Sequence, residues 1–108
     1  MTGSNRLTLS GTIAALDALR HTPAGIALVE FVLAHDSQQA EAGAARQVKL
    51  EMRCVAVERD ARLIAAAPLG SLIEIEGFLA PKGKSSRQLV LHVAKYEFKQ
   101  GATDGNVR

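Results

Sequence analysis

Apolar and polar residues alternate along several stretches of this chain, and a period of two residues is typical of a β-strand with one buried face. The clearest stretch is 48–55, V-K-L-E-M-R-C-V, in which four apolar residues alternate with Lys49, Glu51 and Arg53. Less regular versions of the pattern recur before and after it. The predicted strands are, in chain order, residues 6–13, 26–34, 48–55, 71–80 and 88–98.

One segment has the composition of a helix instead. Residues 60–67, D-A-R-L-I-A-A-A, are strong helix formers with Asp60 near the start, and Pro68 and Gly70 follow them. An acidic residue in the first turn and a proline after the last are typical helix boundaries. We therefore predict one short helix between the third and fourth strands.

Three strands, a short helix and two further strands are the order of the OB-fold, a five-stranded Greek-key barrel. This all-β fold is the predicted fold class, with residues 1–100 as the OB-fold domain and 101–108 as a flexible C-terminal tail. Gly11 and Gly77 interrupt the first and fourth strands and predict bends there. An SH3-like barrel and a split α/β domain are the alternatives.

The remaining segments are predicted to be loops. Residues 17–25 and 81–87 contain proline and glycine, which mark turns. Residues 35–46, H-D-S-Q-Q-A-E-A-G-A-A-R, have no apolar stripe, and we predict a mobile loop there.

The composition fits one soluble globular domain. The chain has 108 residues, of which 47% are hydrophobic and 22% charged, enough for one core but not for two. Its single cysteine, Cys54, forms no internal disulfide and favours a reducing compartment. No signal peptide or membrane span is apparent from the apolar pattern. We expect a cytoplasmic protein without membrane association.

The net charge of +2 is unevenly distributed along the chain. Between residues 80 and 95 lie Lys82, Lys84, Arg87 and Lys95 without an acidic residue, which leaves 9 of the 13 basic and all 11 acidic residues elsewhere. The first three cations fall in the loop between the fourth and fifth strands. In an OB-fold this loop flanks the oligonucleotide groove, so the charge favours nucleic-acid binding over a merely solvated surface.

Three further cations have positions that could extend the basic surface. Lys49 and Arg53 lie on the polar face of the third strand, with Glu51 between them. Arg20 lies in the loop between the first two strands, on the other side of the same groove. The candidate DNA-binding residues are therefore Lys82, Lys84, Arg87, Lys49, Arg20 and Arg53.

No arrangement of residues predicts catalysis. Neither of the common phosphate-binding glycine motifs occurs, and His21, His35 and His92 lack the spacing of metal ligands. Cys54 shares its strand face with core residues, which predicts a buried thiol rather than a nucleophile. We expect a protein that is not an enzyme and that requires no metal or other cofactor.

Short motifs along nearly the whole chain resemble one bacterial family. They are N-R-L-T-L-S-G-T at 5–12, P-A-G-I at 23–26, F-V-L-A-H at 31–35, E-A-G at 41–43, G-S-x-I-x-I-x-G-F at 70–78 and L-V-L-H at 89–92. This set is similar to primosomal replication protein N, the B protein of the replication-restart primosome. The resemblance implies a homodimer related to bacterial single-stranded DNA-binding protein.

The resemblance also implies a role and a set of binding residues. The family binds single-stranded DNA, steadies and stimulates the primosomal helicase at repaired forks, and helps to recruit helicase-loading proteins. Lys82, Lys84, Arg87 and Arg20 would neutralise phosphates. Where a well-known member of that family carries a tryptophan on the third strand, this chain has Lys49, so we expect binding through phosphates more than through bases.

Two alternatives remain open at this stage. One is a general single-stranded DNA-binding protein, although the ending G-A-T-D-G-N-V-R lacks the acidic, apolar tail expected of that class. The other is a protein-interaction adaptor for which DNA is incidental. For the dimer, the first strand and the valines Val29, Val32 and Val55 offer candidate apolar surface.

Overall fold

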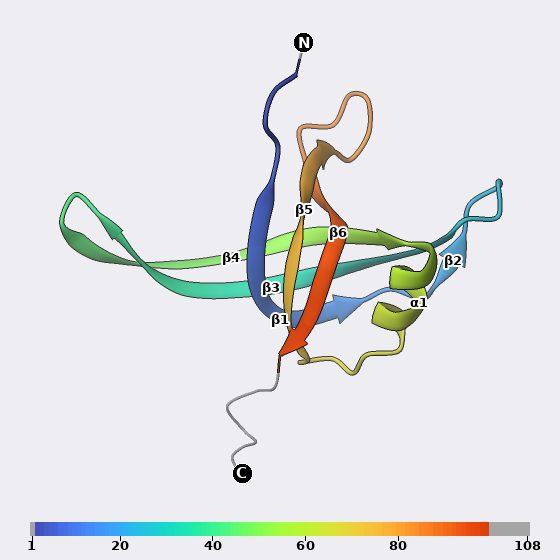
Figure 1. The fold of residues 1–108 in the computed structure, drawn as a ribbon, viewed down its shortest axis with the longest axis horizontal. Coiled ribbons are helices and arrows are strands. Elements are labelled where there is room, and N and C mark those ends of the chain that lie inside the picture. Colours follow the sequence, from blue (N-terminus) through green and yellow to red (C-terminus); the bar gives the residue numbers. More distant parts are fainter. Residues whose placement is uncertain (1, 100–108) are drawn as a thin grey trace.

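The computed structural model describes residues 2–99, and strands form most of it (Figure 1). The strands are β1 Leu7–Leu16, β2 Arg20–His21, β3 Ala27–Glu41, β4 Ala44–Val57, β5 Leu72–Pro81 and β6 Leu89–Lys99, with the single helix α1 Glu58–Ala65 between β4 and β5. All five predicted strands are present, and the helix lies between the predicted third and fourth of them. The short β2 is additional, and the predicted tail 101–108 lies outside the described residues.

The strands close into a barrel because β1 pairs with two different neighbours. Their order is β1-β5-β6-β4-β3-β2, and a further pairing of β1 with β3 joins the two sides. β1 pairs with β5 up to Thr12 and with β3 from Thr12 onward. Gly11 lies at this change, where a Cβ atom would overlap the carbonyl oxygen of Ala34. The predicted bend at Gly11 is thus the corner at which β1 leaves one half of the barrel for the other.

A second glycine allows the close pairing of β5 with β6. The register shifts between Glu76 and Gly77, and Ala94 is the extra residue on β6. A Cβ atom on Gly77 would overlap the carbonyl oxygen of His92. The irregularity predicted at Gly77 is therefore confirmed, and its cause is the close approach of the β6 backbone.

The prediction of a mobile loop at 35–46 is wrong. β3 and β4 pair continuously from Leu28 opposite Val57 to Glu41 opposite Ala44, and the hairpin projects from the barrel (Figure 1). Its turn is Ala42–Gly43, with φ angles of 53° and 79°. Two positive φ angles are typical of the two-residue turns that match strand twist. Beyond the barrel both faces of the hairpin meet water, so no apolar stripe marked it as a strand.

The core lies inside the barrel and beneath α1. Its fully buried members include Ile13, Val29, Phe31, Leu33, Cys54, Ala61, Ile64, Ile73, Ile75 and Leu91. Burial raises the pKa of the Cys54 thiol to about 12, so the prediction of an unreactive buried thiol is confirmed. Val29 is one of these core residues and Val55 is only 9% exposed, so neither contributes the apolar surface expected of it. Within the described range, no helix has the length and apolar character needed to span a membrane.

Candidate nucleic-acid interface

A row of four side chains crosses the outer face of the barrel. Glu30 of β3 is opposite Val55 of β4, Val55 is opposite His92 of β6, and His92 is opposite Phe78 of β5. Residues paired across neighbouring strands project to the same face of a sheet. The row therefore runs from an acidic residue to two aromatic rings without leaving the solvent side of the barrel.

A pocket of about 200 Å³ lies along this row. It is lined by Leu28, Glu30, Val55, Pro81, Lys82, Val90 and His92. The lining comes from β3, β4, the end of β5, β6 and the start of the loop 82–88, so the pocket is at the position where an OB-fold binds oligonucleotides. We call this pocket the groove, and we include in it the cations Arg20, Arg53, Lys82, Lys84 and Arg87 described below.

The loop 82–88 supplies three cations to one side of the groove. The backbone N–H of Lys82 donates to the carbonyl of Gln88 over 2.8 Å, and that of Ser86 donates to Gly83 over 3.1 Å. The first bond holds the two ends of the loop together where it projects between β5 and β6, and the second closes a turn within it (Figure 1). Lys82, Lys84 and Arg87 are exposed, and none of them forms an ion pair with another residue of 2–99.

The two arginines predicted for the groove are held by one carboxylate. Arg20 of β2 contacts Oε2 of Glu30 at 2.7 Å, and Arg53 of β4 contacts Oε1 at 2.9 Å. The Glu30 side chain is only 19% exposed. The hydrogen bond from Arg20 is the largest cause that holds the pKa of Glu30 below its ordinary value, and the hydrogen bond and charge of Arg53 act in the same direction. We call these three residues the Glu30 cluster.

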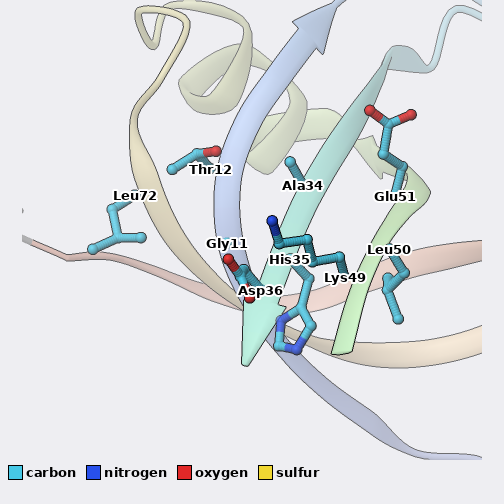
Figure 2. Close-up of a pocket in the computed structure, with 9 residues that line it drawn as sticks. All are labelled: Gly11, Thr12, Ala34, His35, Asp36, Lys49, Leu50, Glu51 and Leu72. Carbon is cyan, nitrogen blue, oxygen red and sulfur yellow. The ribbon is translucent and has the colours of Figure 1, made fainter. Parts of the chain in front are cut away.

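Lys49 lies away from the other predicted residues, in a second and larger pocket. This pocket of about 580 Å³ is lined by Gly11, Thr12, Ala34, His35, Asp36, Lys49, Leu50, Glu51 and Leu72 (Figure 2). Lys49 is opposite Asp36 in the β3–β4 ladder, so two acidic side chains line the pocket beside one basic one. The structure therefore does not bring Lys49 into the basic loop. It shares only the outer face of β4 with Arg53.

Two residues of the row were missed by the sequence analysis. The rings of Phe78 and His92 are stacked, with centroids 4.9 Å apart and planes inclined by 2°. Phe78 is 45% exposed although it is a large apolar side chain. The alternation of β5 could have predicted this exposure, because Phe78 continues the outward-facing series of Glu74 and Glu76. Gly77 interrupts the alternation just before Phe78, so the series was not followed that far.

The histidine in the motif F-V-L-A-H is used structurally. Nδ1 of His35 is 2.6 Å from the carbonyl oxygen of Ser10, and Nε2 is 2.7 Å from the hydroxyl of Ser37. The ring thus joins β3 to the edge of β1. Residues 2–99 contain no group of three or more His, Cys, Asp or Glu side chains arranged to hold a metal ion.

Sequence comparison identifies the family of the chain. Residues 5–95 match a family described as "another single-strand binding protein family". The replication restart protein PriB of Nitrosomonas europaea is 45% identical over 89 residues, which cover 82% of each chain. The chain belongs to the PriB family. A PriB of Bordetella pertussis is 43% identical over 82% of this chain and 83% of its own, and one of Yersinia enterocolitica is 37% identical over 91% and 95%.

Solved structures of PriB and of a single-stranded DNA-binding protein share the fold. PriB of Ralstonia solanacearum matches with a TM-score of 0.83 and 31% identity over 91% of this chain and all of its own. The single-stranded DNA-binding protein of Thermus aquaticus matches with a TM-score of 0.74 and 26% identity over 94% of this chain and 52% of its own. The predicted OB-fold and the predicted family are both confirmed.

The structure divides the six predicted binding residues of this PriB-family chain into three groups. Lys82, Lys84 and Arg87 are together and free of ion pairs among residues 2–99, Arg20 and Arg53 are together but ion-paired, and Lys49 is apart. Sequence position predicted where each residue lies along the chain. It gave no indication that Glu30 would hold two of the cations.

Proposed function

We propose that this chain is a single-stranded DNA-binding accessory protein of the replication-restart primosome. The observation that carries the proposal is the 45% identity to a replication restart protein PriB over 82% of both chains. The protein stabilises and stimulates the primosomal helicase at stalled or repaired forks and helps to recruit helicase-loading proteins. It acts in the cytoplasm, where no catalytic step, metal or other cofactor of its own is required.

The structure supports a route for the DNA backbone along the groove. Lys82, Lys84 and Arg87 project from one loop and have no carboxylate partner among residues 2–99, so a phosphate is their available counter-ion. Phosphate contacts supply affinity without sequence preference. Arg20 of β2 and Arg53 of β4 would extend the route on leaving Glu30, and Lys49 lies further along the outer face of β4.

Binding of a labelled oligo-dT at several salt concentrations tests the DNA-binding half of the proposal. Three neutralised phosphates per subunit, at ~0.7 counter-ions per contact, give a log–log slope of about −2 per subunit. Undetectable binding at low salt, or an affinity that does not change with salt, would contradict it.

We also propose that two copies pair through β1. Residues Leu7 to Gly11 of β1 pair with β5 on one side only, because the pairing with β3 begins at Thr12. An unpaired strand edge is a template for another strand. Light scattering at micromolar concentration decides the point, since a dimer has twice the chain mass and a measured mass near 11.5 kDa rules it out.

A protein adaptor with little DNA binding is the second candidate function. The observation in its favour is the ion pairing of Arg20 and Arg53, which removes two of the six predicted cations from immediate use. Helicase stimulation by the variant Lys82→Ala/Lys84→Ala/Arg87→Ala separates the two functions. Full stimulation without DNA binding supports the adaptor, whereas parallel loss of both supports the DNA-binding protein.

A further inference from the structure

We propose that Phe78 and His92 form a stacking platform for one nucleobase of single-stranded DNA, at the edge of the groove beside Lys82. This inference rests on the proposed DNA binding and adds a residue class that the basic loop does not supply. Phosphate contacts alone would leave the bases in water, whereas a platform of this kind also binds the base.

The geometry of the ring pair carries the inference. The two rings are nearly parallel, with an interplanar angle of 2° and a centroid separation of 4.9 Å. They come from paired positions of β5 and β6, so neighbouring strands fix both side chains on the outer face. A nucleobase is also a flat ring, and stacking it on this pair extends an arrangement that the two strands already hold.

The exposure of Phe78 is a second observation. The side chain is 45% exposed, whereas the interior-facing Ile73 and Ile75 of the same strand are fully buried. Its neighbours along the outer face of β5, Glu74 and Glu76, are charged. An aromatic ring at this place loses water contact when a base stacks on it, and stacking of a base on an aromatic side chain is sequence-tolerant because every base has a π-face.

The surroundings of His92 include a cation that a phosphate next to the ring pair would meet. His92 and Lys82 both line the pocket of about 200 Å³, together with Val55 of β4, which is paired with His92. A base on the platform would therefore extend over apolar surface while the adjacent phosphate meets the Lys82 ammonium. This arrangement of an aromatic face beside a basic loop is the one that single-strand binding requires.

The platform supplies contact with a base, which Lys49 cannot supply. Lys49 offers a charge but no ring and the chain contains no tryptophan, so the sequence alone predicts phosphate contacts and little stacking. Phe78 and His92 lie on different strands from Lys49; His92 lines the pocket of about 200 Å³, and Phe78 stacks on it from β5. We infer that this chain stacks a base at the β5–β6 side of the groove.

Paired oligonucleotides test the platform directly. Binding of oligo-dT and of an abasic oligonucleotide of equal length is measured by anisotropy for wild type, Phe78→Ala, His92→Ala and the double variant. Loss of one stacked base predicts about 5- to 100-fold weaker binding of oligo-dT by the double variant, with an unchanged salt slope. Binding of the abasic oligonucleotide should stay within about twofold. Equal losses on both oligonucleotides, or no loss on either, would overturn the platform.

Phe98 offers a matched control. It is 40% exposed and stands edge-on to Tyr96 with ring centroids 5.7 Å apart. It lines a pocket with Leu63 of α1 and residues of the segment 66–71, none of which lines the groove. Phe98→Ala removes a phenyl ring of similar exposure and should leave the affinities for oligo-dT and for the abasic oligonucleotide unchanged. Should Phe78→Ala fail to fold by circular dichroism, Phe78→Leu keeps the apolar bulk and should still lose the preference for oligo-dT over the abasic strand.

A tryptophan probe gives an independent readout because the chain contains no tryptophan. In Phe78→Trp the new indole is the only one, and its fluorescence should be quenched on addition of oligo-dT but not of the abasic strand. Phe98→Trp should show no quenching. Conversion of the Phe78→Ala variant from dimer to monomer would overturn the platform by assigning Phe78 to contact between copies. Failure of wild type to bind oligo-dT refutes the proposed function, whereas wild-type binding with unaltered variants refutes the platform alone.

Discussion

The basic loop 82–88 and the Glu30 cluster lie on opposite sides of the same groove, yet their cations are in different electrostatic states. In the loop, Lys82, Lys84 and Arg87 form no ion pair with residues 2–99. In the cluster, Arg20 and Arg53 are 2.7 and 2.9 Å from the oxygens of Glu30. A count of charges along the sequence gives the cations of the two regions the same weight. In the structure, only those of the loop are without a carboxylate partner among residues 2–99.

The difference matters because DNA must compete with Glu30 for the two arginines. A phosphate that reaches Lys84 displaces only water and counter-ions, and their release favours binding. A phosphate that reaches Arg20 must replace a carboxylate already in contact, so much of the electrostatic gain is offset by the contact that is lost. We therefore expect affinity to depend on the loop and the position of β2 to depend on the cluster.

Removal of the loop cations should have the largest effect. The variant Lys82→Ala/Lys84→Ala/Arg87→Ala should lose about 100-fold in oligo-dT affinity at 0.1 M salt, since three contacts contribute a slope of about −2. The log–log salt slope of the variant should be smaller in magnitude than that of wild type by about 2. Replacement of Arg59, Arg62 and Lys99 by alanine is the control with equal charge change, and a similar loss there would show that only net charge matters.

Release of the two arginines should have the next largest effect, in the opposite direction. Glu30→Gln frees Arg20 and Arg53 and should raise oligo-dT affinity about 5- to 10-fold at 0.1 M salt, with a steeper salt slope. Glu51→Gln removes one negative charge from the same face of β4 and should raise affinity less. Weaker binding by Glu30→Gln would mean that the cluster positions the arginines for DNA rather than withholding them.

The stability contributed by Glu30 should depend on pH. Because the folded-state pKa of Glu30 is lowered, its contribution is present above the unfolded pKa of about 4.3 and is lost as the pH falls through the lower folded value. Urea unfolding should show wild type more stable than Glu30→Gln by about 1–2 kcal/mol at pH 7. The difference should shrink below about pH 4, and a difference that is constant down to pH 3 would contradict this explanation.

Single arginine substitutions should have the smallest effect on DNA binding. Arg20→Ala and Arg53→Ala should each change oligo-dT affinity by less than about threefold, whereas Lys82→Ala should cost about fivefold at 0.1 M salt. Titration of the three variants side by side checks the ranking. If Arg20→Ala lowers affinity and salt slope as much as Lys82→Ala does, Arg20 leaves Glu30 for a phosphate when DNA binds.

Much of the fold was predictable because, in the barrel, apolar positions along each strand match the side that faces the core. The alternation in 48–55 marks a strand, and on its apolar face Cys54 lies in the core whereas Leu50, nearer the tip of the hairpin, is 38% exposed. Prediction failed where that agreement ends. The hairpin of β3 and β4 is held by backbone pairing through Glu41 and Ala44 with water on both faces, so its side chains carry no strand period.

The candidate site was predictable only one residue at a time. Chain position and charge identified Lys82, Lys84 and Arg87, because a loop between two strands must lie at the surface. They could not predict that Phe78 would face His92, since these residues are 14 positions apart and meet through the β5–β6 register. That register shifts at Gly77, where the backbone of β6 approaches too closely for a side chain.

The sequence by itself determined the succession of the five main strands along the chain, the single helix, the buried thiol and the basic loop. Each of these follows from local periodicity, from helix and turn residues, or from local charge. Tertiary structure alone decided which of the cations are free and which rings stack. Both depend on strand register, which brings Glu30 of β3 beside Arg53 of β4 and Phe78 of β5 beside His92 of β6. Pairing between distant segments sets that register, and no local pattern encodes it.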